Sequence, residues 1–182
     1  MGSTFKNIGI SGVAGSGKNT LSEIIIKFLE RMELSPISQK LYGIDPCSCS
    51  REEKDIIRPL LVAHGEVKRK LSKGKHWTNL LHKDLDEEKV NIITDVRYSE
   101  YKDDEIDWLK NDANGVLIHL SRYIEKNNDR VYIKAMNQSE KRNDPIMRDK
   151  ADFALNWNTY EDSSQRVAST EKLLKWIKRL YV

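Results

Sequence analysis

Three glycines followed by a lysine are the residues of this chain whose types and spacing most directly indicate chemistry. Gly12, Gly15 and Gly17 precede Lys18, and an amphipathic segment begins directly afterwards. Because glycine tolerates positive φ and has no Cβ, such a loop can wrap with its backbone N–H groups pointing inward. A helix that follows adds unpaired N–H groups and the positive end of its dipole. The pattern therefore predicts a polyphosphate-binding loop in which Lys18 reaches the β- and γ-phosphate oxygens.

The residue after the lysine departs from the commonest form of such loops. Position 19, where a hydroxyl normally sits on Mg²⁺, is Asn19, and the hydroxyl follows at Thr20. The alternative, a glycine-rich turn that happens to contain lysine, is disfavoured by the apolar run before the loop and the helical pattern after it. The residues expected to bind the polyphosphate are Gly12, Ala14, Gly15, Ser16, Gly17, Lys18, Asn19 and Thr20.

A carboxylate and two arginines follow two further apolar runs. Asp95 and Arg97 come directly after residues 90–94, and Arg122 follows residues 116–120. In open α/β sheets, ligands bind at the carboxyl ends of the strands. A carboxylate at that edge can hold Mg²⁺ through water or take a proton from an attacking phosphate, although aspartate also suits a helix N-cap. Arginine presents a planar fork that matches phosphate oxygens.

These side chains together suggest the parts of a phosphoryl-transfer site, because charge spreads over the moving phosphoryl oxygens and needs positive groups around it. The expected catalytic residues are Lys18, Asp95, Arg97 and Arg122, and the expected Mg²⁺ ligands are Thr20 and Asp95.

Apolar periodicity predicts the elements that must position these residues. Strands are expected at residues 5–10, 37–42, 90–94, 116–120 and 151–155. Helices are expected over residues 21–32, 51–63, from 76, 99–110 and from 162 to the end. Ser50 and Glu53 form a capping-box pattern for the second of these helices, and Gly65 is expected to interrupt it. Strands that alternate with helices predict a three-layer α/β fold with a five-stranded parallel sheet and helices on both faces.

Residues 123–150 are polar and rich in charge. This composition would fit disorder, and in the expected fold it also fits a mobile lid. The residues of this segment expected to act on the ligand are Arg130, Glu140 and Arg142.

The bulk composition bounds the class of protein. The 182 residues suffice for one domain, expected to span 1–182, and are few for two. A net charge of +3 is too small to indicate nucleic-acid binding, and no run of about 18 apolar residues predicts a membrane span. Cys47 and Cys49 are expected to be free thiols in a reducing cytoplasm, with a metal site as the less favoured alternative.

Short motifs along nearly the whole chain resemble those of the phage-type deoxynucleoside monophosphate kinases, relatives of adenylate kinase and dephospho-coenzyme A kinase. The motifs are Gly-Ser-Gly-Lys-Asn-Thr ending at Thr20, Arg58-Pro-Leu-Leu with His64-Gly65, Trp77, Asp95-Val-Arg97, Ser139-Glu140, and Asp152 with Asn156. The resemblance implies transfer of the γ-phosphate of ATP, with Mg²⁺, to a deoxynucleoside monophosphate. It also implies that the acceptor is held by Arg58, Arg69, Trp77 and Arg97, with Lys70 as the alternative to Arg69. The histidine usual near the family's Ser-Glu motif is missing here.

The sequence therefore predicts a cytoplasmic kinase that phosphorylates a deoxynucleoside monophosphate, with no nucleic-acid or membrane partner. It leaves a homodimer open. Three alternatives remain at this point: a kinase of another small acceptor such as a sugar acid or a coenzyme precursor, an ATP-dependent switch or motor subunit, and a nucleotide-binding protein without catalysis.

Overall fold

The computed structural model describes residues 7–22, 50–159 and 163–180. The strands are β1 (Asn7–Ser11), β2 (Asn91–Thr94), β3 (Gly115–Lys126), β4 (Asp129–Tyr132) and β5 (Phe153–Asn158). The helices are α3 (Arg51–Ser72), α4 (Lys75–Asp84), α5 (Glu105–Asp107), the π-helix η1 (Trp108–Asp112), α6 (Gln138–Lys150) and α7 (Ser163–Leu180). The predicted strand at residues 37–42, the predicted helix 21–32 beyond residue 22, and both cysteines lie outside the described residues.

The sheet is mixed rather than parallel throughout. Four strands run parallel in the order β2-β1-β3-β5, and β4 pairs antiparallel with the far end of β3. The prediction of an all-parallel five-stranded sheet is therefore wrong, because β4 runs antiparallel to its neighbour. The apolar run predicts a strand that ends at residue 120, whereas β3 continues through mostly polar residues to Lys126.

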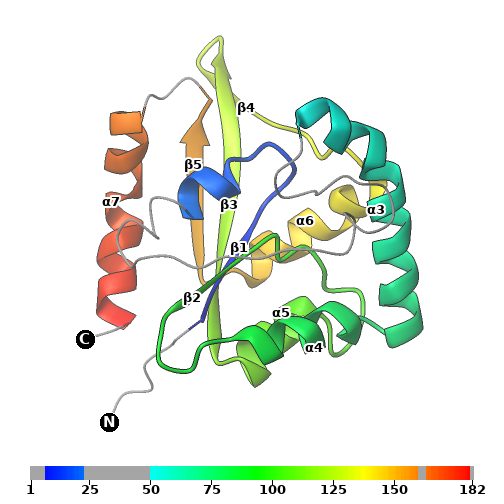
Figure 1. Ribbon diagram of the computed structural model, residues 1–182. Helices are drawn as coiled ribbons and strands as arrows, with labels where there is room; N and C mark the ends of the chain where they lie inside the picture. The colour runs from blue at the N-terminus through cyan, green and yellow to red at the C-terminus, as the bar shows by residue number, and fades with distance from the viewer. Residues whose placement is uncertain (1–6, 23–49, 160–162, 181–182) are drawn as a thin grey trace.

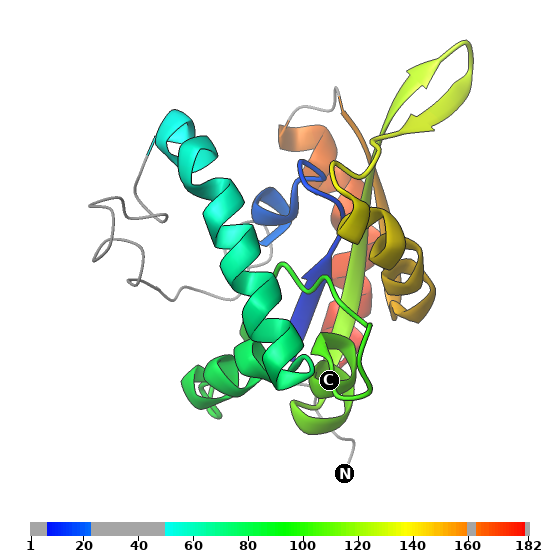
Figure 2. The ribbon, with the colours of Figure 1, turned by 90° about the vertical axis from the view of Figure 1, so that its right-hand side faces the viewer.

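The turn between β3 and β4 explains why the chain reverses there. Asn127 and Asn128 both have positive φ, at 52° and 67°. Two such residues form a tight turn whose twist suits a hairpin, and asparagine tolerates this conformation better than most residues. The hairpin projects beyond the rest of the sheet (Figure 2). Tyr123 and Tyr132 face each other across it, with ring centroids 5.8 Å apart.

Two apolar clusters, one on each face of the sheet, produce the three layers (Figure 1). Alternate residues of β3 divide between them, because successive strand side chains point to opposite faces. Val116, Ile118 and Leu120 join the cluster with Leu173 and Ile177 of α7. Leu117 joins the cluster formed with Trp108 and Leu109 of η1 and Met147 of α6. The predicted α/β architecture with helices on both faces is confirmed.

Two helices differ from their predicted extents. The capping box of α3 is present, with Ser50 Oγ accepting from Glu53 N at 3.2 Å and Glu53 Oε2 accepting from Ser50 N at 2.9 Å. The helix then continues through Gly65 to Ser72, since one glycine in a helix costs only about 1 kcal/mol. The predicted helix 99–110 begins only at Glu105, because the buried Asp104 caps it there.

The segment predicted as a lid is ordered as the β3–β4 hairpin and α6. Met147 and Asn143 of α6 are buried, and the helix contacts β1 and β3. Within the described parts of the chain, no helix is both long and apolar enough to cross a membrane.

The position of Ile118 generates a test of this core. Its side chain is fully buried in the cluster with Leu173 and Ile177 of α7, so Ile118→Ala should lower the free energy of unfolding by about 2–5 kcal/mol in urea denaturation. The exposed Val131 on β4 supplies the control, and Val131→Ala should change it by less than about 0.5 kcal/mol. Equal losses in the two variants would contradict the described core.

Candidate functional site

The glycine-rich loop joins β1 to a helix whose described residues are 18–22. Gly12, Gly15 and Gly17 have φ of 142°, 77° and 94°, values that other residues rarely adopt. A Cβ on Gly17 would also lie 3.0 Å from the ring of Trp157 on β5. Ser16 is fully buried, and its Oγ has no hydrogen-bond partner among the described residues. The loop thus has the curled backbone that its sequence predicts, with an unsatisfied hydroxyl inside it.

Lys18 points back across this loop. Its Nζ donates to Gly12 O at 3.0 Å and Val13 O at 3.2 Å, and lies 3.3 Å from Asp95 Oδ1. Only 6% of the side chain is exposed. Burial lowers the pKa of this ammonium, and Arg97 adds to that effect, whereas Asp95 opposes it. A cation with little solvent is therefore held beside the curled backbone.

Asp95 connects the loop to Arg97. Arg97 Nη2 donates to Asp95 Oδ1 at 2.8 Å, and Asp95 itself has a φ of 68° at the end of β2. Burial alone would raise the pKa of Asp95, but Arg97 and Lys18 outweigh it and hold the pKa below its ordinary range. The structure therefore brings Lys18, Asp95 and Arg97 together, as the sequence predicts.

Two further predicted residues reach the loop from β3 and α6. Arg122 Nη1 donates to Gly15 O at 2.8 Å. Glu140 Oε2 accepts from Ala14 N at 3.4 Å, and its Oε1 lies 3.5 Å from Arg97 Nη1. The contact of Arg122 follows from the sheet order, because parallel strands run towards the same edge, whereas Glu140 reaches the loop from the first turn of α6.

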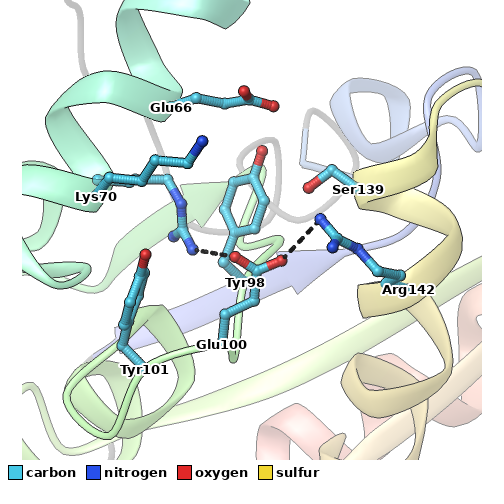
Figure 3. Close-up of a pocket in the computed structure, with 8 residues that line it drawn as sticks. Glu66, Lys70, Tyr98, Glu100, Tyr101, Ser139 and Arg142 are labelled. Carbon is cyan, nitrogen blue, oxygen red and sulfur yellow. Dashed lines mark hydrogen bonds and ion pairs between the residues drawn. The ribbon is translucent and has the colours of Figure 1, made fainter.

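A polar hollow opens between α3 and α6, and Tyr98, the residue after Arg97, is part of its lining (Figure 3). It measures about 360 Å³ with its open mouth included. Its lining consists of Glu66, Arg69, Lys70, Tyr98, Glu100, Tyr101, Ser139 and Arg142. Glu100 reaches across it, with Oε2 at 3.2 Å from Arg69 Nη2 and Oε1 at 3.5 Å from Arg142 Nη2. The lining thus combines three cations, two carboxylates and two phenol rings, and Glu100 pairs with two of the cations.

Arg69 forms part of the wall of this hollow, and its charge is paired with Asp104. It is 4% exposed, and Asp104 accepts from both of its terminal nitrogens at 2.8 and 3.0 Å. Its guanidinium lies 3.6 Å from the centre of the Tyr98 ring. Lys70, the alternative to Arg69, is exposed at the hollow, so it is the better placed of the two to meet an acceptor phosphate.

Other predicted acceptor and lid residues lie elsewhere or outside the description. Trp77 on α4 packs its ring against His76 and His64, at 4.6 and 6.2 Å between centroids, and does not line the hollow. Arg130 on β4 lies over the Tyr123 ring, 4.6 Å from its centroid. Arg58 belongs to α3, and its side chain lies outside the described residues.

Sequence reasoning missed the carboxylates that hold the segment after Asp95. Asp104 accepts from the backbone N–H groups of Glu100 and Tyr101, and Glu105 accepts from those of Arg97 and Tyr98, at 2.6 and 3.1 Å. Three consecutive acidic residues at 103–105 could have indicated these contacts. They lie within the predicted helix 99–110, where they would be expected on an exposed face. These contacts fix the backbone on which Arg97 and Tyr98 stand.

The donor atoms near the loop fit Mg²⁺ in type, since hard oxygen ligands suit that ion. Asp95 offers a carboxylate that is 47% exposed, and Thr20 is half-buried on the first helical turn after the loop. Among the residues that the structure describes, no group of three or more His, Cys, Asp or Glu side chains is arranged to hold a metal ion. A metal ion at this site would therefore need oxygen ligands from a bound molecule or water in addition to those of the protein.

No family model matches the chain, and neither a curated protein nor a solved structure matches it. The geometry of the loop and its neighbours is therefore what bears on function.

Glu105, whose side chain is 16% exposed, gives a pH prediction. Burial raises its pKa from 4.5 to about 7, Asp104 adds to the rise, and Arg69 with two backbone N–H groups opposes it. The folded chain thus binds this proton more tightly than the unfolded chain, so the stability from the protonated carboxyl is complete below pH 4.5 and is lost as pH rises to about 7.

Glu105→Gln removes this titration. The difference in free energy of unfolding, variant minus unsubstituted protein, should therefore increase as pH rises from 4.5 to about 7. The increase should be about 3 kcal/mol at most. Urea denaturation at a series of pH values measures the difference. A difference that stays constant between pH 4.5 and 8 would contradict the prediction.

Proposed function

We propose that this protein is a P-loop kinase that transfers the γ-phosphate of ATP to a deoxynucleoside monophosphate. The observation that carries the proposal is the loop itself, where three glycines at positive φ surround an unpartnered buried hydroxyl and the buried Lys18 ammonium lies across the backbone. Curled backbone N–H groups next to a helix N-terminus and a fixed lysine form an anion site for polyphosphate.

The donor half of the site is the loop with its basic neighbours. Backbone N–H groups of Ala14 to Thr20 would cradle the phosphates of ATP. Lys18 would bridge the β- and γ-phosphates, and Arg122, already bonded to Gly15 O, would stand at the same phosphates. Thr20 and Asp95 would hold Mg²⁺, which would neutralise charge on the β- and γ-oxygens.

The acceptor half is the polar hollow between α3 and α6. The monophosphate would contact Lys70 in the lining and Arg97, the residue before Tyr98. The flat base would lie among Tyr98, Tyr101 and the polar wall. The acceptor's phosphate oxygen attacks the γ-phosphorus, a new P–O bond forms, and the bond to the β,γ-bridging oxygen breaks with ADP as leaving group. No nucleophilic side chain is needed. Alignment of the two phosphates and stabilisation of the transition state by the surrounding positive charge would accelerate the transfer. Movement of α6 over the bound substrates would exclude water and complete the lid role that the sequence suggests.

Purified protein with Mg-ATP and a panel of deoxynucleotides, ribonucleotides, sugars and single-stranded DNA tests this function. We expect ADP production that a deoxynucleoside monophosphate stimulates. Stimulation by another small acceptor alone would indicate a different kinase, whereas stimulation by DNA alone would overturn the kinase proposal.

Lys18→Ala should lower kcat/KM by about 10²–10³-fold or more, because the ammonium acts where transition-state charge develops. Lys141→Ala, an exposed lysine of α6, is the matched control and should retain activity. Equal values of kcat/KM in the two variants would show that Lys18 takes no part in the reaction.

Arg97→Ala should act mainly on the acceptor. Losing a charged hydrogen bond to the monophosphate should raise KM for the acceptor about 10- to 100-fold, with a smaller change in KM for ATP. Steady-state kinetics with each substrate varied measures both constants, and Arg179→Ala on α7 is the control. Unchanged acceptor kinetics would show that the hollow between α3 and α6 is not the acceptor site.

A further inference from the structure

Glu140 stands at the mouth of the phosphate loop as a buried carboxylate. It occupies the first turn of α6, where Asn137 Oδ1 caps the helix by accepting from Glu140 N at 2.8 Å. Glutamate at this position of a helix commonly accepts from the backbone N–H of its own N-cap residue. Here Oε2 accepts from Met136 N at 3.3 Å and from Ala14 N of the loop at 3.4 Å. One carboxylate oxygen thus joins α6 to the phosphate loop.

The contacts of Glu140 complete a chain of alternating charges around the loop. Lys18 contacts Asp95 at 3.3 Å, Asp95 contacts Arg97 at 2.8 Å, and Arg97 contacts Glu140 at 3.5 Å. Glu140 then reaches the N–H of Ala14. Two cations and two carboxylates balance one another, and only 8% of Glu140 is exposed. The carboxylate therefore occupies a place where the loop offers an N–H to an anion.

A phosphate group bound in the loop would compete for the Ala14 N–H and would lie against a like charge. Like charges a few ångströms apart, with little water between them, repel strongly. A divalent cation bound to the phosphate lowers this repulsion because it reduces the negative charge of the ligand. The cation can also attract carboxylates near the loop, such as Asp95. The same loop therefore treats a bare phosphate and a metal-complexed phosphate differently.

We propose that Glu140 is a specificity-determining residue that occupies the phosphate loop in the empty protein, excludes bare anions, and yields to phosphate that carries a divalent cation. Its displacement breaks the contact with Arg97 and frees Nη1 of that arginine for the acceptor phosphate. Occupation of the donor site is in this way linked to readiness of the acceptor site. This inference rests on the proposed phosphate-binding role of the loop.

Calorimetric titration with inorganic pyrophosphate, in EDTA and in Mg²⁺, tests the proposal without any need for catalysis. Glu140→Gln removes the charge and keeps the shape, so we expect it to tighten binding of metal-free pyrophosphate about 10-fold or more. The gain should be smaller in Mg²⁺. Asp144→Asn is the matched control, since Asp144 lies on the same helix and contacts His119 and Arg148 instead of the loop, and its affinity should stay within about twofold.

The possible failures are distinguishable. If Lys18→Ala loses pyrophosphate binding while Glu140→Gln binds metal-free pyrophosphate no better than the unsubstituted protein, the role of Glu140 is wrong and the phosphate loop stands. If the protein binds pyrophosphate under neither condition, the proposed function and this inference both fail. Should Glu140→Gln not fold, the ¹³C carboxyl resonance of Glu140 decides in the unsubstituted protein: pyrophosphate with Mg²⁺ should shift it, and an unmoved resonance overturns displacement.

Discussion

The contact between Lys18 and Asp95 is the interaction on which the arrangement of the site depends. A buried ammonium is costly unless a carboxylate and hydrogen-bond acceptors compensate for lost water, and Asp95 with two loop carbonyls does so here. The pair ties the loop after β1 to the end of β2. Through Asp95 the compensation extends to Arg97, and through Arg97 to α6. Three segments distant in sequence are therefore held at one edge of the sheet by charge balance.

Ion pairs of this kind are better suited to exchange than to large net stability, because desolvation offsets much of their attraction. Each member of the chain from Lys18 to Glu140 is a group that a phosphate or a metal ion can replace as a partner. The apolar clusters on the two faces of the sheet, in contrast, hold the strands in place whichever partners the charges have. The fold thus separates an apolar scaffold from a polar edge at which the charged side chains pair.

A second group of carboxylates, Asp104 and Glu105, mainly holds the backbone in place. Asp104 and Glu105 are largely buried and accept from the backbone of the segment that carries Arg97 and Tyr98, and Asp104 also holds Arg69. These contacts give the polar hollow a fixed wall on the α3 side. The α6 side carries Arg142, which is 72% exposed and is linked to that wall through Glu100. Glu100 therefore joins the two sides of the hollow.

The sequence by itself determined the loop, because glycine spacing and the following lysine encode a local backbone shape that needs no distant contact. It also indicated the strands β1 and β2, and the rule that ligands bind at the carboxyl ends of the strands predicted Lys18 and Asp95 at one edge of the sheet. The ion pair between them was decided by the tertiary structure. Only the tertiary structure decided that β3 continues to Lys126 and turns back at Asn127 and Asn128, since a polar strand carries no apolar pattern. It also placed Glu140 against Ala14, and it buried Arg69 among carboxylates. Such pairings join residues far apart in the chain, and the type of a charged side chain does not reveal which partner burial will give it.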